Sequence, residues 1–327
     1  MRHRDGKSRS KRYLTALGAA AFGLLGLGGA ALAGDVTVPG TTDFPESMTG
    51  TADGTLYFSS FTGGRIFRAE PGAQQASEWV KPGSLATVLG VLADAKSGTL
   101  YACSPDLASM GFKTPGSGHG GRLALFDLKT GAAKASLPMP GNPTLCNDIA
   151  VAGDGTAYIT DSLAGNILRL KPGAQALEIW VHDPRWVVEG KAQLDGIAVL
   201  PDGNVYANVF EGDGLYRIAV NGDGSAGAIT KLKTSRPLYH CDGLRAYGPN
   251  RLLMVEGETK GNLDLVTISG DEAQIETVKS GFEGPVSLWQ VGQTVYVLDV
   301  PLKYLFDPKM KTEMPPPFTA FAVPAPQ

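Results

Sequence analysis

Four residues with oxygen-bearing side chains recur at one position of a repeated segment. The segments align on the apolar residue that opens their second strand, and the position lies eleven residues before it. In chain order it holds Glu46, Gly90, Asn147, Asp195, Asp242 and Pro285. Carboxylate and amide oxygens are the ligands that hard divalent cations prefer, and neither His nor Cys occurs at this position. The pattern predicts a bound Ca²⁺, with Mg²⁺ or Mn²⁺ as alternatives.

The six copies of this segment start 43 to 57 residues apart. A period in this range indicates one supersecondary unit repeated along the chain. Each copy has two apolar runs around a polar turn, then a Gly-rich turn and a third run, and a shorter fourth run such as ASEWV (76–80) follows. Four short antiparallel strands joined by hairpins make a propeller blade. We therefore predict an all-β fold, a six-bladed β-propeller of four-stranded antiparallel blades in one domain, residues 34–327.

Three parts of this ring need separate interpretation. The third strand of the sixth blade is predicted at LKYLFDP (302–308), and no sustained helical periodicity appears after residue 33. A propeller usually pairs a strand from one terminus with the blade at the other, and the candidates are DVTVP (35–39) and FTAFAVP (318–324). The longest insertion, residues 104–120, is rich in Gly, Pro and Ser, and is either a lid or a disordered surface loop.

The first strand of each blade lines the central channel, so equivalent positions of different blades should converge at one height. A single Asp or Asn before a strand is usually a turn or capping residue. Four such residues at one offset favour a shared role, because three carboxylates and an amide in a narrow channel repel one another unless a cation binds them. Asp53, Asp154 and Asp202 recur equally well, but each stands in an Asp-Gly hairpin tip and is interpreted as a turn residue.

The same segments resemble a known family. Pro45-Glu46 opens the first repeat, Cys-Asn-Asp (146–148) the third, DGIAVLPDG (195–203) the fourth and DGL (242–244) the fifth. In this pattern, over nearly all of the chain after residue 33, the sequence resembles the regucalcin/gluconolactonase (senescence marker protein-like) propellers. More distantly it resembles the paraoxonases and the bacterial lactonases related to them.

The resemblance implies a divalent cation in the channel, bound by Glu46, Asn147 and Asp242. Asp195 stands where the family commonly has Asn, and it can still ligate while adding a negative charge. Asp148 is a further candidate for metal binding or positioning. In a regular strand its side chain would point away from that of Asn147.

The activity implied is hydrolysis of a lactone or similar small ester. The cation would polarise the carbonyl, and Asp242 would orient or deprotonate the attacking water. A second hypothesis is a non-catalytic propeller with a structural ion, whose rim binds a ligand or a protein. A strictosidine-synthase-like enzyme shares the architecture, but it would not need an acidic ring.

Four other residues could contribute to the site. His240 should share a strand face with Asp242, and is either a base or, as we favour, a packed loop residue. His119 could cap the site if the insertion is a lid. Arg245 and Trp289 follow channel positions, and either shape a substrate pocket or, as we favour, pack within their blades.

The chain contains three cysteines, Cys103, Cys146 and Cys241, so at least one thiol is free unless two chains pair. Blades three and five are not neighbours, which places Cys146 and Cys241 too far apart for a disulfide. We interpret both as small buried apolar residues.

The N-terminus has the pattern of a secretory signal peptide. Residues 1–12 are strongly basic, and residues 14–33 are apolar and end in Ala31-Leu32-Ala33. A membrane anchor is the alternative, but the small residues and the processing site favour cleavage after Ala33 and export to the periplasm or the medium. The net charge of −3 gives no reason to expect nucleic acid as a partner, or a membrane once the signal is removed.

Overall fold

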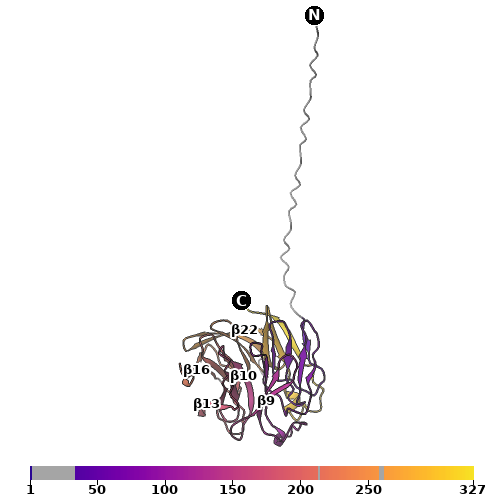
Figure 1. Ribbon diagram of the computed structural model, residues 1–327, viewed down its shortest axis with the longest axis vertical. Helices are drawn as coiled ribbons and strands as arrows, with labels where there is room; N and C mark the ends of the chain where they lie inside the picture. The colour runs from indigo at the N-terminus through magenta and orange to yellow at the C-terminus, as the bar shows by residue number, and fades with distance from the viewer. Residues whose placement is uncertain (2–33, 213, 258–260) are drawn as a thin grey trace. The chain divides into compact units, whose positions relative to one another are not determined.

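Each repeat folds as one antiparallel sheet, and the six sheets form the blades of a β-propeller (Figure 1). The computed structural model describes Met1 and residues 34–212, 214–257 and 261–327. Apart from Met1, the predicted signal peptide (1–33) lies outside the described residues. The prediction of a six-bladed propeller with four-stranded antiparallel blades is confirmed.

The first three blades each run outward from the channel in chain order. Blade one contains β2 (Met48–Gly50), β3 (Leu56–Phe58), β4 (Ile66–Ala69) and β5 (Ser77–Val80). Blade two contains β6 (Val91–Asp94), β7 (Thr99–Ser104), β8 (Arg122–Asp127) and β9 (Ala133–Pro138). Blade three contains β10 (Cys146–Val151), β11 (Ala157–Asp161), β12 (Asn166–Leu170) and β13 (Glu178–His182).

Blade four keeps this order, and blades five and six differ from it in their outer strands. Blade four contains β14 (Leu194–Val199), β15 (Val205–Val209), β16 (Leu215–Val220) and β17 (Ala226–Lys231). Blade five contains β19 (Cys241–Ala246), β20 (Arg251–Glu256), β21 (Asn262–Ser269) and β22 (Glu272–Ser280), with β18 (Lys233–Thr234) parallel to β22. Blade six contains β23 (Pro285–Val291), β24 (Thr294–Asp299), β25 (Thr319–Pro324) and β1 (Val36–Thr37).

The two ends of the chain together complete the sixth blade. β25 is its third strand and β1 is its fourth, with Val36 opposite Ala320 and Thr37 opposite Thr319. Both candidate segments for ring closure therefore take part, and they pair with each other. β2 also contacts β23, so the first and last blades adjoin, with yellow strands beside indigo ones in Figure 1.

The prediction of a strand at residues 302–308 is wrong. This segment holds the short helix α1 (Lys303–Phe306), which follows Pro301 and begins with a hydrogen bond from the Tyr304 amide to the Pro301 carbonyl. The segment has no partner strand left, because β25 already occupies the place next to β24. Two 3₁₀ turns, η1 (Ala108–Met110) and η2 (Pro184–Trp186), are the other described helical segments.

The apolar core lies between neighbouring blades. One cluster joins Leu123 of blade two to Ile149 and Ile159 of blade three, and all three side chains are fully buried. The opposite face of blade three, with Tyr158 and Ile167, belongs to the cluster that it shares with blade four, so the blade buries both of its faces. In the described part of the chain, no helix has both the length and the hydropathy of a membrane span.

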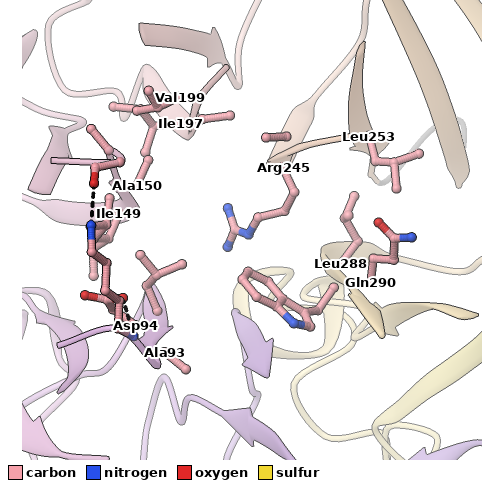
Figure 2. Close-up of a pocket in the computed structure, with 18 residues that line it drawn as sticks. Ala93, Asp94, Ile149, Ala150, Ile197, Val199, Arg245, Leu253, Leu288 and Gln290 are labelled. Atoms are coloured by element: carbon pink, nitrogen blue, oxygen red, sulfur yellow. Dashed lines mark hydrogen bonds between the residues drawn. The ribbon is translucent and has the colours of Figure 1, made fainter. Parts of the chain in front are cut away.

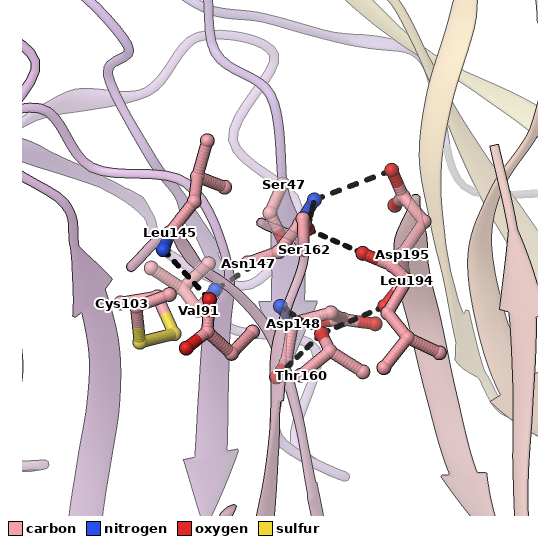
Figure 3. Close-up of a disulfide and its surroundings, with 12 residues drawn as sticks. Ser47, Val91, Cys103, Leu145, Asn147, Asp148, Thr160, Ser162, Leu194 and Asp195 are labelled. Carbon is pink, nitrogen blue, oxygen red and sulfur yellow. Dashed lines mark hydrogen bonds between the residues drawn. A yellow bond between two sulfur atoms is a disulfide. The ribbon is translucent and has the colours of Figure 1, made fainter. Parts of the chain in front are cut away.

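A disulfide joins blades two and three, which the sequence interpretation missed. Cys103 in β7 is bonded to Cys146 in β10 (Figure 3). Cys241 is a buried free thiol. The interpretation of Cys146 as an unpaired apolar residue is therefore wrong, and that of Cys241 is confirmed. Blade three adjoins blade two, and the Cα atoms of the bonded cysteines lie 5.1 Å apart.

We expect the double variant Cys103→Ala/Cys146→Ala to lose about 2–4 kcal/mol of free energy of unfolding, because the disulfide closes a loop 43 residues long in the unfolded chain. Urea denaturation followed by circular dichroism measures this loss. Wild-type protein in reductant should show a similar loss. A thiol titration of unreduced, unfolded protein should detect Cys241 alone, and three reactive thiols would contradict the pairing.

Candidate functional site

The four predicted ligand residues stand where the first strands begin, at one end of the channel. Asn147, Asp195 and Asp242 are each the second residue of β10, β14 and β19, and Glu46 lies two residues before β2. The innermost strands of these blades all start at the same face of the propeller, so their first residues lie at the same height in the channel. Sequence alignment therefore identified residues that occupy equivalent places in space.

The carboxylates of Glu46, Asp195 and Asp242 come together in a small cavity. One oxygen from each lies within 4.8 Å of the others. Asn147 joins the group, because its Nδ2 donates to Asp195 Oδ2 at 3.2 Å and to Ser162 Oγ at 3.0 Å (Figure 3). Both bonds use the amide nitrogen, which leaves the amide oxygen as a ligand atom.

A β-bulge shapes the start of each of these strands. The pairing register shifts between Cys146 and Ile149 in β10, and equivalent shifts occur in β14 and β19. A bulge re-aims side chains and breaks the strict alternation of a strand. Asn147 and Asp148 both border the acidic cavity, but Asn147 bonds to Asp195 whereas Asp148 pairs with Arg245. That their side chains point apart stays a prediction.

Asp148 faces Arg245 rather than the acidic group. Arg245 Nη1 donates to Asp148 Oδ2 at 2.5 Å, and Nη2 donates to Oδ1 at 3.1 Å. Asp148 Oδ2 also accepts from the Ile197 amide at 3.2 Å. The Asp148–Arg245 pair is buried and joins blade three to blade five across the channel. The sequence marked Asp148 and Arg245 separately, but nothing in it pointed to their pairing.

Glycines let the blades approach closely around the cavity. A Cβ at Gly90 would overlap the carbonyl oxygen of Asn147, which accepts a hydrogen bond from the Gly90 amide at 2.6 Å. A Cβ at Gly196 would likewise overlap the carbonyl of Asp242. Gly90 is one of the six aligned residues but offers no ligand side chain. Its lack of a Cβ thus determines how closely blade two approaches Asn147.

Burial and mutual repulsion disfavour negative charge on this group. The pKa of Asp195 is raised to about 7, first by burial and then by the charge of Asp148. Burial likewise raises the pKa of Glu46 and of Asp242 well above the ordinary range, and Asp195 contributes to both shifts. A divalent cation bound here would lower these pKa values again, because it stabilises the ionised carboxylates.

The donor set fits a hard cation. Three carboxylates and an amide supply oxygen ligands, and the four residues are 5–8% exposed. The cavity they line has a volume of about 10 Å³, which is roughly the space that one water molecule or one ion needs. Oxygen-only ligation of this kind suits Ca²⁺, Mg²⁺ or Mn²⁺.

The two histidines lie outside the acidic cavity. His240 stacks on Phe210, with ring centroids 5.0 Å apart and planes at 12°, and its backbone has a positive φ of 46°. This placement matches a packed loop residue. His119 is exposed, and its carbonyl oxygen accepts a hydrogen bond from Arg122.

The insertion at residues 104–120 is packed, so the description of a disordered loop does not apply. Asp106 Oδ2 accepts from the amides of Gly118 and Gly120 at 2.6 and 3.1 Å. Phe112 stands edge-on to Phe61 and Phe306, with centroid separations of 5.0 and 5.8 Å. The insertion connects the second and third strands of its blade, on the face where the acidic residues lie.

The ring of six blades and the acidic cluster at one end of its channel define a six-bladed propeller with a candidate cation site. No family model and no curated protein matches the sequence. Solved structures do share the fold. They include a regucalcin from Agrobacterium tumefaciens, described as calcium-binding (TM-score 0.63, 14% identity, 90% of this chain and 96% of that one).

Two further solved structures share the fold. A gluconolactonase from Xanthomonas campestris has a TM-score of 0.60 and 18% identity, covering 82% of this chain and 86% of its own. The Malassezia sympodialis allergen Mala s 1 has a TM-score of 0.65 and 14% identity, covering 89% and 96%. The resemblance to regucalcin and gluconolactonase is thus confirmed for the fold. The more distant likeness to paraoxonases stays a prediction.

We expect Ca²⁺ to raise the melting temperature more at about pH 8 than near pH 5. In the folded protein the pKa of Asp195 is about 7, whereas its ordinary value is 3.8. Without metal, protonated Asp195 therefore stabilises the fold fully below about pH 4. This contribution is lost as the pH rises through 7. Differential scanning fluorimetry with Ca²⁺ or EDTA measures the difference. Asp195→Asn should flatten this pH dependence, and an equal Ca²⁺ shift at both pH values would contradict it.

We also expect Gly90→Ala to weaken Ca²⁺ binding and lower the melting temperature, because the new methyl group would push blade two away from Asn147. Calorimetric titration with Ca²⁺ measures the affinity. Gly222→Ala is the matched control, since a Cβ there meets open space at a hairpin tip. Equal affinities for the two variants would show that this close approach does not shape the site.

Proposed function

We propose that this chain is an exported hydrolase that uses a divalent cation, most simply Ca²⁺, to open a lactone or similar small ester. The observation that carries the proposal is the meeting of Glu46, Asp195 and Asp242 with Asn147 in one buried cavity. When bound there, the cation would polarise the ester carbonyl and stabilise negative charge on its oxygen.

The protein's own side chains would divide the work. Glu46, Asn147 and Asp195 would hold the cation. Asp242 would contact the cation as well, and beside the cation its carboxylate would be ionised and able to accept a proton. We assign Asp242 the role of orienting the attacking water and taking up its proton.

Fold similarity supports the enzyme class without fixing the substrate. The solved structures with this fold include gluconolactonases, and a small-molecule substrate agrees with the narrow channel. Because the acidic cavity has room for little more than an ion, the ester would approach from the face where the first strands begin.

Export is part of the proposal. The N-terminal pattern predicts a signal peptide, and a disulfide such as Cys103–Cys146 persists mainly in oxidising compartments. Edman sequencing of protein isolated from the producing cell tests this point. We expect the mature chain to begin at Gly34.

A non-catalytic role remains the second candidate function. The same small cavity suits a structural ion that neutralises the inner ends of four blades. In that case chelation would lower stability, and no ester or lactone would be hydrolysed.

The variants Asp242→Asn and Glu46→Gln separate these functions. We expect each to lower Ca²⁺-dependent lactone hydrolysis by about 10²-fold or more, since a positioned base and a bound cation each contribute that much. A pH-stat screen of aldonolactones and homoserine lactones, with and without EDTA, is the assay. Exposed Asp223→Asn and Glu276→Gln are matched controls. Full activity of both site variants in EDTA would exclude the mechanism.

A further inference from the structure

A second and larger cavity opens at the other end of the channel. It has a volume of about 510 Å³ and is formed where the first strands of blades two to six end. The acidic cluster lies where these strands begin, so the two sites are on opposite sides of the Asp148–Arg245 pair. This volume falls within the range of small-molecule pockets.

The walls of this channel-end cavity are mostly apolar. Figure 2 shows Ile149, Ile197 and Val199 on one side and Leu253 and Leu288 on the other. The charged and amide side chains stand at its rim, namely Asp94, Lys96 and Gln290. Apolar walls of this extent, left to water, favour a ligand with an apolar body.

Arg245 extends between these walls, as Figure 2 shows, and it is only 7% exposed. A guanidinium has five N–H bonds. Three of them are used, two on the carboxylate of Asp148 and one on the carbonyl of Leu244 at 2.8 Å.

The two remaining N–H bonds of Arg245 belong to Nε and Nη2. Among the described residues, Nε has no hydrogen-bond partner, and Nη2 has none beyond Asp148. In a planar guanidinium these two bonds are parallel and form a fork that matches the two oxygens of a carboxylate. A buried donor without an acceptor costs about 1–3 kcal/mol, which an acceptor on a ligand would recover.

The charges around the cavity already balance one another, so a ligand there should carry as little negative charge as its hydrogen bonds require. Asp148 already pairs with Arg245, and Lys96 and Asp94 at the rim offset each other. A phosphate group would bring up to two negative charges, and neither would meet an unpaired cation. A carboxylate uses both free N–H bonds and brings one charge.

We propose that this channel-end cavity binds a small organic carboxylate, whose apolar body lies against Ile149, Ile197 and Leu288 and whose two oxygens accept from Nε and Nη2 of Arg245. This site is separate from the acidic cluster. It does not depend on the proposed hydrolase activity.

The test uses the whole protein and 3-phenylpropanoate as the probe, with binding measured by isothermal titration calorimetry. The neutral probe 3-phenylpropanamide has nearly the same shape. Ala246→Trp places a large ring at the exposed mouth of the cavity, and Ala228→Trp, exposed on the outer strand β17, is the matched control. Arg245→Lys keeps a cation beside Asp148 and removes the fork.

We expect 3-phenylpropanoate to bind the wild type and the Ala228→Trp variant equally. Binding should be lost in Ala246→Trp. It should weaken about tenfold or more with the amide probe and in Arg245→Lys, the loss of a charge-assisted pair of hydrogen bonds.

Three results would overturn the proposal: no binding of the carboxylate to wild type, equal binding of acid and amide, or unchanged binding in Ala246→Trp. The probe comparison needs only wild-type protein, and Ala246→Trp leaves Arg245 in place. The outcome therefore stands even if Arg245→Lys fails to fold.

Discussion

The arrangement of the whole ring depends on hydrogen bonds that buried side chains make from one blade to the next. First strands of neighbouring blades are not joined by a strand ladder, so their main-chain groups need other partners. Ser47 Oγ accepts from the Val91 amide at 3.2 Å, and Thr160 Oγ1 donates to the Asp195 carbonyl at 2.8 Å. Asn208 Nδ2 donates to the Asp242 carbonyl at 2.7 Å. Because leaving such groups unpaired is costly, these bonds fix the height at which the acidic residues meet.

Charge is layered along the channel that these contacts define. At one end, three carboxylates share a space so small that burial and repulsion raise their pKa values. One step further in, Arg245 and Asp148 form a neutral, buried pair, and Arg245 lowers the cost of ionising Glu46 and Asp195. Beyond the pair the walls become apolar. A single arginine thus separates a polar chamber from an apolar one while lining both.

The repeat predicted most of the fold, and the common offset predicted which residues would come together. Both depend on local patterns repeated six times, so an error in one copy is corrected by the others. The failures arose where one copy departs from the rest, where two blades are joined, or where a strand is irregular. Lys303–Phe306 forms a helix because the strand place beside β24 is taken by β25. The Cys103–Cys146 bond and the Asp148–Arg245 pair join different blades, and one sequence carries no signal for such pairings. The bulge at Asn147 escaped prediction because a regular strand was assumed.

The pairing of β1 with β25 also determines when the fold of the chain can be completed. The Ala322 amide donates to Asp35 Oδ1 across 287 positions of the chain. Blades one to five can form as their own segments leave the ribosome, since their strands are close in sequence. The sixth blade cannot, because its outermost strand is made first and its partner is made last. Contacts of such long separation form late and slowly, so the open ring, with an unpaired edge at each end, is the species most exposed to aggregation or to exchange of strands between chains.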